Sequence, residues 1–384
     1  MRYISSDVAD FVKFMTNVVA CHQWLVLYSF FFLCVAIPLP GFAATPVPLG
    51  LPEVPVPEAN PQSPAKIALG KRLFEDTRLS ADGTLSCASC HQAEHAFADR
   101  LPVAEGLGKK KGTRNTPSLL NVAYLTSLFW DGRRDTLEKQ AGDPFVNQIE
   151  HGLKDHQALL KIIQQDADYL RAFNDVFRVE GANVDLGHVS MAIASFERTL
   201  ISAGSAFDRS YYGKEPDAMS ESAKRGLSLF RGKGRCISCH TFNEKYALFT
   251  DNEFHSIGVG LDSVKQNLAD TTRRVVKSKP EATFVLLASD RDIAALGRFN
   301  VTRKPADIGR FRTPTLRNVA LTPPYMHDGS VRTLEEAIAI EIYYRGNATN
   351  QPIILSKQDA DDLLNFLIAL TSPPWPRDTP LGPQ

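Results

Sequence analysis

Apolar residues recur at helical spacing along most of the chain beyond residue 62, whereas alternating strand patterns are few. Ser63 followed by Pro64 is typical of a helix start, with a capping hydroxyl and a proline in the first turn. Further helices are predicted over 184–201, from Ser220 to Phe230, and after Ser356. In the helix predicted over 184–201, the apolar face is formed by Val189, Ile193, Phe196 and Leu200. In the helix after Ser356, it is formed by Leu363, Phe366, Leu367 and Leu370. The pattern predicts a mainly α-helical protein with long loops.

The first 44 residues differ from the rest and predict an export signal. Residues 24–37 are almost wholly apolar, and prolines and small residues ending at Ala44 follow as a cleavage region. A membrane-spanning helix needs about 20 apolar residues, and this run is shorter, so an uncleaved anchor is the alternative. The segment before the apolar run is unusually long for an export signal, so translation starting at Met15 is an alternative. Residues 45–62 are proline-rich and are expected to be extended, and export predicts a periplasmic location.

The balance of charged residues gives no support to a nucleic-acid partner. The chain has 384 residues, enough for two domains, with 43 Lys and Arg balancing 43 Asp and Glu. This balance gives no sign of a nucleic-acid partner, and the basic run 109–111 is interpreted as solvated loop charge. Both a monomer and a homodimer are consistent with this composition.

A segment of the first half of the chain returns in the second half. The stretch 114–123 (RNTPSLLNVA) is repeated at 312–320 (RTPTLRNVA). A constant offset of 197 positions aligns Thr116, Pro117 and Asn121 with Thr313, Pro314 and Asn318. The same offset pairs 130–132 (WDG) with 327–329 (HDG), and 136–138 with 333–335, both of which read TLE. Two copies of one module are the simplest account.

Each copy follows its own CxxCH motif. Of six cysteines, Cys21 and Cys34 lie in the export segment, and the other four form CASCH and CISCH. In such a motif the two thiols add across the vinyl groups of heme, and the histidine reaches the iron. Zinc would need a further ligand pair beside each motif, and a dithiol enzyme would not need histidine at the fifth position twice. We therefore predict two covalently bound hemes c, held by Cys87, Cys90 and His91 and by Cys236, Cys239 and His240.

The chain resembles the bacterial diheme cytochrome c peroxidases and the related methylamine-utilisation (MauG-type) diheme enzymes. The resemblance covers nearly all of the chain after the export segment and is carried by LGKRLFEDTRLSADGTLSCASCH, RNTPSLLNVAYLTSLFWDGR and LGRFNVTRKPADIGRFRTPTLRNVALTPPYMHDGSVRTLEEA. It implies two cytochrome c-like domains whose hemes face a shared interface. These would be a peroxidatic domain over 63–215 and an electron-transfer domain over 216–384.

The same resemblance assigns roles to single residues. His91 and His240 would be the proximal iron ligands, and Trp130 would lie between the hemes. Gln140 and Glu150 would lie over the open face of the first heme, where a carboxylate can move the proton that O–O cleavage requires. The family also holds a calcium ion between its domains. Its matching ligands here are Asn115, Thr322 and Pro324, the last two through backbone carbonyls.

Two departures from the family bear on function. Peroxidases that need reductive activation carry a histidine shortly before the Asn115 position, but residues 105–114 contain none. His95 is interpreted as a helix-face or loop histidine and not as a ligand, so the first heme is expected to be open at rest. At the second heme, the methionine of typical peroxidases would fall at Glu341. Tyr343 is the favoured sixth ligand by resemblance to the MauG type, followed by Tyr344, and Met326 is the remaining candidate.

The leading hypothesis is a periplasmic peroxidase that reduces hydrogen peroxide with electrons from a small redox protein, either a cytochrome c or a cupredoxin. The alternative is a MauG-like oxidase that modifies a partner protein or another substrate through a high-valent heme. A pure electron-transfer cytochrome is a third hypothesis, but it would leave Gln140 and Glu150 without a task.

Overall fold

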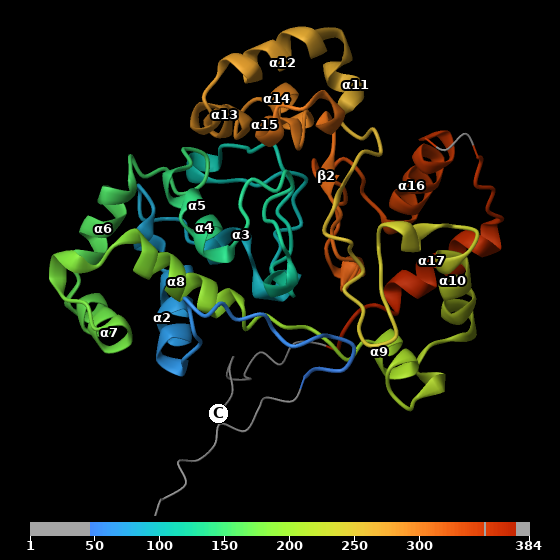
Figure 1. Ribbon diagram of the computed structural model, residues 1–384, viewed down its shortest axis with the longest axis horizontal. Coiled ribbons are helices and arrows are strands. Elements are labelled where there is room, and N and C mark those ends of the chain that lie inside the picture. Colours follow the sequence, from blue (N-terminus) through green and yellow to red (C-terminus); the bar gives the residue numbers. More distant parts are fainter. Residues whose placement is uncertain (1–46, 349–350, 374–384) are drawn as a thin grey trace, which may run out of the picture. The chain divides into compact units, whose positions relative to one another are not determined.

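The computed structural model of the protein describes residues 47–348 and 351–373, which belong to one compact unit beginning at Val47 (Figure 1). The predicted export signal lies outside the described residues. Within the described ranges, no helix is both long and apolar enough to cross a membrane.

The structure is mainly helical, as predicted, with one two-stranded antiparallel sheet among the described residues. In that sheet, β1 (Phe254–His255) pairs with β2 (Phe311–Arg312). The helices are α2 (Pro64–Glu75), α3 (Cys87–Cys90), α4 (Leu137–Ala141), α5 (Asp143–Val146), α6 (His156–Gln164), α7 (Ala167–Phe177), α8 (Leu186–Glu197), α9 (Ala206–Tyr211), α10 (Glu221–Arg231), α11 (Leu261–Val264), α12 (Leu268–Lys277), α13 (Pro280–Leu287), α14 (Arg291–Ala295), α15 (Phe299–Thr302), α16 (Leu334–Ala348) and α17 (Lys357–Ile368).

The helix starts follow the local sequence. Ser63 caps α2, its hydroxyl accepting a hydrogen bond from the Lys66 amide at 3.2 Å, and Ser220 and Ser356 cap α10 and α17 in the same way. The helix predicted over 184–201 is shorter, because it begins after the cap Asp185 and ends at Glu197. The chain then turns away, and the Leu200 carbonyl accepts a hydrogen bond from the Asn121 amide instead of one within the helix.

Two helix pairs organise the two halves of this unit. Helix α2 packs on α8, and α10 packs on α17 (Figure 1). A glycine permits the close approach in each pair. A Cβ at Gly70 would lie 1.9 Å from the carbonyl oxygen of Ala192, and one at Gly226 would lie 2.0 Å from that of Asp362. Any larger side chain would therefore force the helices apart.

Each helix pair contributes to its own apolar core. The first core gathers residues of the N-terminal half, among them Leu73, Phe74, Phe145, Leu159, Phe173, Ile193 and Phe196. The second gathers residues of the C-terminal half, among them Phe207, Phe230, Phe249, Leu363 and Phe366. A third, smaller cluster lies within α12–α15 and contains Val275, Leu287, Ile293, Ala294, Leu296 and Phe299.

The repeated sequence segments adopt the same local geometry. Asn121 and Asn318 both have a left-handed backbone, with φ of 63° and 61°. Their side-chain oxygens accept equivalent hydrogen bonds of 2.9 Å, from the amides of Ser202 and Ser372. An isolated antiparallel bridge follows in each copy, Leu128 with Arg134 and Tyr325 with Val331, again at the offset of 197.

Candidate active site

The N-terminal CxxCH motif is arranged to present an imidazole nitrogen to a metal. Cys87 and Cys90 begin and end the short helix α3, and neither is in a disulfide. His91 follows, and its Nδ1 donates to the Phe97 carbonyl at 3.0 Å. This bond leaves Nε2 as the ligating nitrogen. Burial lowers the pKa of His91, which favours the neutral imidazole that binds iron.

One cavity joins this motif to the predicted catalytic residues. It is lined by Cys87, Cys90 and His91 and also by Gln140, Pro144 and Glu150. Gln140 comes from α4 and Pro144 from α5, while Glu150 follows in the loop after α5. Segments separated by about 60 positions in sequence thus line one cavity, and the roles that the family resemblance implies for Gln140 and Glu150 stay predictions.

Glu150 has the properties of a group that exchanges protons near neutral pH. Its Oε1 accepts a hydrogen bond of 2.6 Å from Asn147 Nδ2. Burial raises the pKa of Glu150 to about 7, while the positive charge of Arg133 and the Asn147 hydrogen bond oppose that rise. A carboxyl with a pKa near the working pH can both accept and return a proton.

The loop 105–114 brings no histidine to this cavity. It packs on the segment that precedes Glu150, and the Leu107 amide donates to the Ile149 carbonyl at 2.7 Å. Gly106 makes this contact possible, because a Cβ there would lie 2.0 Å from the Ile149 oxygen. His95 lies in a 3-10 turn and lines neither of the cavities that contain a CxxCH motif.

The C-terminal CxxCH motif has the same design. Cys236 belongs to a 3-10 turn that ends just before Cys239, and His240 Nδ1 donates to the Phe249 carbonyl at 3.0 Å. Burial lowers the pKa of His240 to about 4 and so keeps the ring neutral. These three residues line a second cavity.

The candidates for the sixth ligand of the second iron are placed differently from one another. Glu341 and Met326 line the second cavity, and burial raises the pKa of Glu341. Tyr343 is 64% exposed and does not line the cavity, because two helical positions separate it from the face of α16 that carries Glu341. Tyr344 does not line it either. The structure therefore does not bring Tyr343 to the site, and its assignment stays a prediction.

Trp130 lies where the two cavities adjoin, since it lines both of them. Its Nε1 donates to the carbonyl of Asn115 at 2.9 Å, which fixes the indole plane. Asn115 also lines both cavities. An aromatic ring that lines both cavities can relay electrons between groups bound in them, which is the role that the family resemblance implies for Trp130.

Two buried arginines test whether heme fits these cavities. Arg312 lines both cavities and is 5% exposed, and its Nε has no hydrogen-bond partner in the described structure. Arg114 lines the first cavity, and its Nη1 also lacks a partner there. Burial lowers the pKa of both guanidinium groups to about 10. Buried cations require anions, and heme propionates would supply them, so the donors present fit heme.

The predicted calcium ligands line one cavity, and their assignment stays a prediction. Asn115, Thr322 and Pro324 all line the second cavity. The Asn115 side chain donates through Nδ2 to the Leu101 carbonyl at 2.9 Å, which leaves its Oδ1 as the oxygen available to a cation. Oxygen donors of this kind suit calcium.

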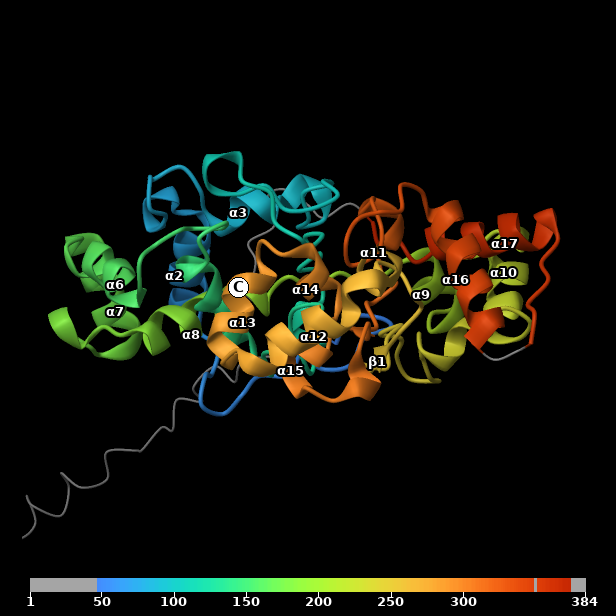
Figure 2. The ribbon, with the colours of Figure 1, turned by 90° about the horizontal axis from the view of Figure 1, so that it is seen from above.

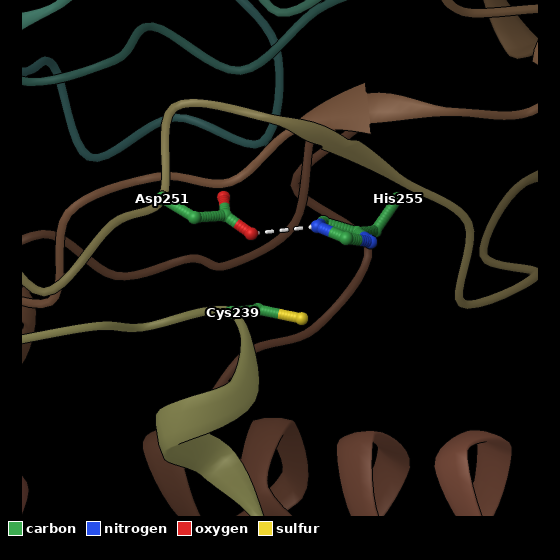
Figure 3. A group of neighbouring side chains, drawn as sticks. All are labelled: Cys239, Asp251 and His255. Carbon is green, nitrogen blue, oxygen red and sulfur yellow. Dashed lines mark hydrogen bonds and ion pairs between the residues drawn. The ribbon is translucent and has the colours of Figure 1, made fainter.

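Cys239 has two further neighbours, Asp251 and His255, which come from the loop before β1 and from β1 itself (Figure 3). His255 Nε2 lies 2.8 Å from an Asp251 oxygen. The three ligand atoms lie within 4.8 Å of one another, close enough for a metal ion. A thioether bond to heme would use the Cys239 sulfur, so we assign no metal to this group.

Other residues of the first cavity escaped the sequence reasoning. His151 is 4% exposed and Glu197 is 5% exposed, and both line this cavity. Burial raises the pKa of Glu197 to about 8, and its Oε2 has no hydrogen-bond partner among the described residues. Glu197 lies on the apolar helix α8, and a charged residue at the end of an apolar face was the available signal. Arg312 was noted only as the first residue of the repeated segment, and its charge was not considered as a partner for a cofactor.

Comparisons with known proteins agree with this arrangement. The profile of the family described as di-haem cytochrome c peroxidase matches residues 64–216. The chain is 34% identical over 348 residues to the cytochrome-c peroxidase IdrP1 of Pseudomonas sp. (strain SCT), covering 87% of this chain and 88% of that protein. It is 34% identical over 330 residues to the methylamine utilization protein MauG of Methylorubrum extorquens, covering 84% of this chain and 82% of that protein. A crystal structure of a MauG-like protein associated with microbial copper homeostasis matches with a TM-score of 0.68 and 31% identity, covering 88% of this chain and 96% of that chain.

Proposed function

The chain belongs to the di-haem cytochrome c peroxidase family and is an oxidoreductase with heme cofactors, and we propose that it reduces hydrogen peroxide in the cavity that contains Glu150. The observation that carries the proposal is a carboxyl with a pKa near 7 in the same cavity as a CxxCH motif. Electrons would come from a small redox protein through the C-terminal half.

We propose covalent attachment of heme c at Cys87 and Cys90 and at Cys236 and Cys239. Each heme would belong to one cytochrome c-like domain, over 63–215 and 216–384. The matching local geometry of the repeated segments and the separate apolar cores of the two halves support this division. The buried guanidinium groups of Arg114 and Arg312 would pair with heme propionates.

When bound, heme supplies the iron that accepts peroxide and the electrons that break its O–O bond. Glu150 would take the proton from the peroxide oxygen nearer the iron and return it to the outer oxygen, which leaves as water. Gln140 would orient the peroxide by hydrogen bonding. The Pro144 side chain offers no ligating atom, and its carbonyl accepts hydrogen bonds from the Asn147 and His151 amides, so this face would stay open. Each turnover then consumes one peroxide, two electrons and two protons and releases two molecules of water.

Trp130 would relay electrons between the two halves. Its contact with both cavities and the fixed orientation of its indole support this role. A calcium ion at Asn115, Thr322 and Pro324 would hold the two halves in register at the same boundary. The apolar segment of the first 44 residues supports export to the periplasm.

A second candidate is an oxidase that modifies a partner protein or a small substrate, as the similarity to MauG suggests. The observation that favours it is the 105–114 loop, which packs through Leu107 on Ile149 and brings no histidine to the cavity. A heme that is open at rest needs no reductive activation, which favours the oxidase, while reaction with peroxide at this heme is common to both candidates.

Steady-state turnover separates the two candidates. Reduced cytochrome c, and separately a reduced cupredoxin, are mixed with the holoenzyme and hydrogen peroxide, and donor oxidation is followed by absorbance. The peroxidase proposal predicts sustained oxidation of at least one donor with two donor molecules per peroxide. Negligible turnover, despite fast reaction of the heme with peroxide, would overturn it in favour of the oxidase.

A further inference from the structure

Helices α11–α15, from Leu261 to Thr302, form a small subdomain that we call the cap (Figures 1 and 2). The cap has its own apolar core, in which Val275, Ile293 and Leu296 are fully buried. It interrupts the C-terminal half between β1 and β2. Residues 296–302 of the cap begin the third of the motifs that carry the family resemblance, but no motif in residues 261–295 indicated a function.

The cap is fastened to the N-terminal half. Thr113 Oγ1 donates to the Leu287 carbonyl at 2.7 Å, and Arg298 donates to the Gly132 carbonyl at 2.6 Å. The Arg114 guanidinium group donates to the Ala294 carbonyl. These bonds reach residues 113–114 and 132, before and after Trp130 in the sequence, and Thr113 and Arg114 line the first cavity, so the cap and this cavity are positioned together.

Helix α13 of the cap forms part of the wall of the first cavity. Phe284, Leu287 and Ala288 line the cavity that contains His91 and Glu150. The neighbouring residue Val285 points the other way and is 66% exposed. One face of α13 therefore borders the cavity and the opposite face meets solvent.

Phe284 lines the same cavity as Glu150, and both are related to Arg133. The Arg133 guanidinium carbon lies 3.3 Å from the ring centre of Phe129 and 5.7 Å from that of Phe284, so the cation contacts both rings. Arg133 is held by Asp131 at 3.0 Å and is the principal positive charge acting on Glu150. Two aromatic rings thus flank the guanidinium group whose charge acts on Glu150, and all four residues line the first cavity.

We propose that Phe284, supported by Leu287 and Ala288, limits the size of molecules that reach the face of the N-terminal iron next to Glu150. Hydrogen peroxide is admitted, whereas bulky organic molecules are excluded and can react only by electron transfer over a distance. The inference rests on the proposed open heme at His91, and it adds a specificity-determining wall contributed by the other half of the chain.

The test measures access directly, without catalysis. Dithionite-reduced holoenzyme is mixed with carbon monoxide or with tert-butyl isocyanide, and the association rates are followed by heme absorbance. Phe284→Ala is compared with the milder Phe284→Leu and with Val285→Ala on the solvent face of the same helix. We expect Phe284→Ala to raise the isocyanide rate by roughly tenfold or more, because single side-chain groups in apolar pockets discriminate on that scale. The carbon monoxide rate should change less than about twofold, since a diatomic ligand already passes.

Phe284→Leu should give an intermediate isocyanide rate, and Val285→Ala should match the native enzyme. An unchanged ratio of the two rates in both Phe284 variants would overturn the proposal, as would an equal rise in Val285→Ala. If no variant binds carbon monoxide, and the native enzyme does not either, the open heme itself is refuted and the proposed function falls with it. Binding of carbon monoxide with an unaltered ratio refutes the size limit alone.

Discussion

The two CxxCH halves of the molecule share a scaffold but differ at the positions that face their cavities. At the offset of 197, the N-terminal half has the polar Gln140 where the C-terminal half has Ala337. The offset also pairs the non-ligating Pro144 with the carboxylic acid Glu341, and Trp130 with His327. One cavity thus presents groups that handle protons, and the other presents a group that can bind metal. In the proposed function, the shared local geometry would set where each heme attaches, and a few lining residues would decide what each heme does.

Helices α8 and α17 each contribute one residue to the lining of a cavity, and these two residues also differ in polarity. Gly70 contacts Ala192 as Gly226 contacts Asp362, which aligns α8 with α17 at an offset of 170. At this offset Glu197 corresponds to Leu367, and each lines its own cavity. The N-terminal half therefore keeps a buried carboxyl where the C-terminal half is apolar.

The largest effect is expected from removing the proton-transfer group of the N-terminal half. Glu150→Gln should lower the rate constant for reaction with peroxide by about 10²–10⁴-fold, the usual contribution of a positioned acid or base. Stopped-flow absorbance of the diferric enzyme measures this rate. Glu94→Gln, at an exposed carboxyl outside both cavities, is the control. A loss below about threefold in Glu150→Gln would assign proton transfer to another group.

Replacing the shared aromatic should separate the two halves functionally. Trp130→Phe should leave the peroxide reaction intact but slow electron transfer from the C-terminal half by roughly tenfold, which corresponds to ~1.4 kcal/mol in the barrier. Its repeat counterpart His327 lines only the second cavity, so His327→Phe should slow this transfer less. Rapid-scan spectra that resolve both hemes report the two steps. Equal slowing in both variants would remove the relay role of Trp130.

The shared scaffold predicts equal sensitivity of the two helix contacts. Gly70→Ala and Gly226→Ala should each destabilise the protein by about 1–3 kcal/mol, because the added methyl group meets a backbone carbonyl. Gly142→Ala, whose added Cβ would meet its nearest atom at 3.4 Å, is the matched control. Urea unfolding followed by circular dichroism gives the free energies. Destabilisation by one substitution only would mean that the two pairs are not equivalent.

The smallest effect concerns Glu197. Its pKa is raised from 4.5 to about 8 in the folded state, so the folded protein holds this proton more tightly than the unfolded chain does. Stability from this group is therefore complete below pH 4.5 and is lost as the pH rises through about 8. Glu197→Leu installs the residue of the other half. The difference in free energy of unfolding between this variant and the native protein should rise by on the order of 1 kcal/mol from pH 6 to pH 9, in favour of the variant. Urea unfolding at these two pH values measures the gain, and a constant difference between variant and native protein would contradict it.

Sequence periodicity and local chemistry were sufficient for much of the fold. The caps at Ser63, Ser220 and Ser356 follow from the affinity of a hydroxyl for free amides at a helix start, which is a local effect. The family resemblance brought Gln140 and Glu150 to the first heme motif, and the structure joins them in one cavity.

Features that depend on distant contacts were not accessible in this way. The Arg312 Nε without a hydrogen-bond partner is recognisable only in the structure, where the same guanidinium group donates through Nη1 to the Thr313 carbonyl. The cap reaches the first cavity across more than 130 positions of sequence, and nothing local to Phe284 indicates that contact. Tyr343 lies outside the second cavity because a different face of α16 borders that cavity. Which face does so cannot be predicted from an alignment whose register is uncertain by one or two residues.

The central claim is that the N-terminal heme is open at rest while the C-terminal heme is closed. Electron paramagnetic resonance of the as-isolated diferric protein tests it, before and after one equivalent of hydrogen peroxide and without prior reduction. The account predicts one high-spin signal that disappears on addition of peroxide, beside one low-spin signal. Two low-spin signals that are indifferent to peroxide would contradict it, since both irons would then be six-coordinate and Glu150 would have no substrate to act on.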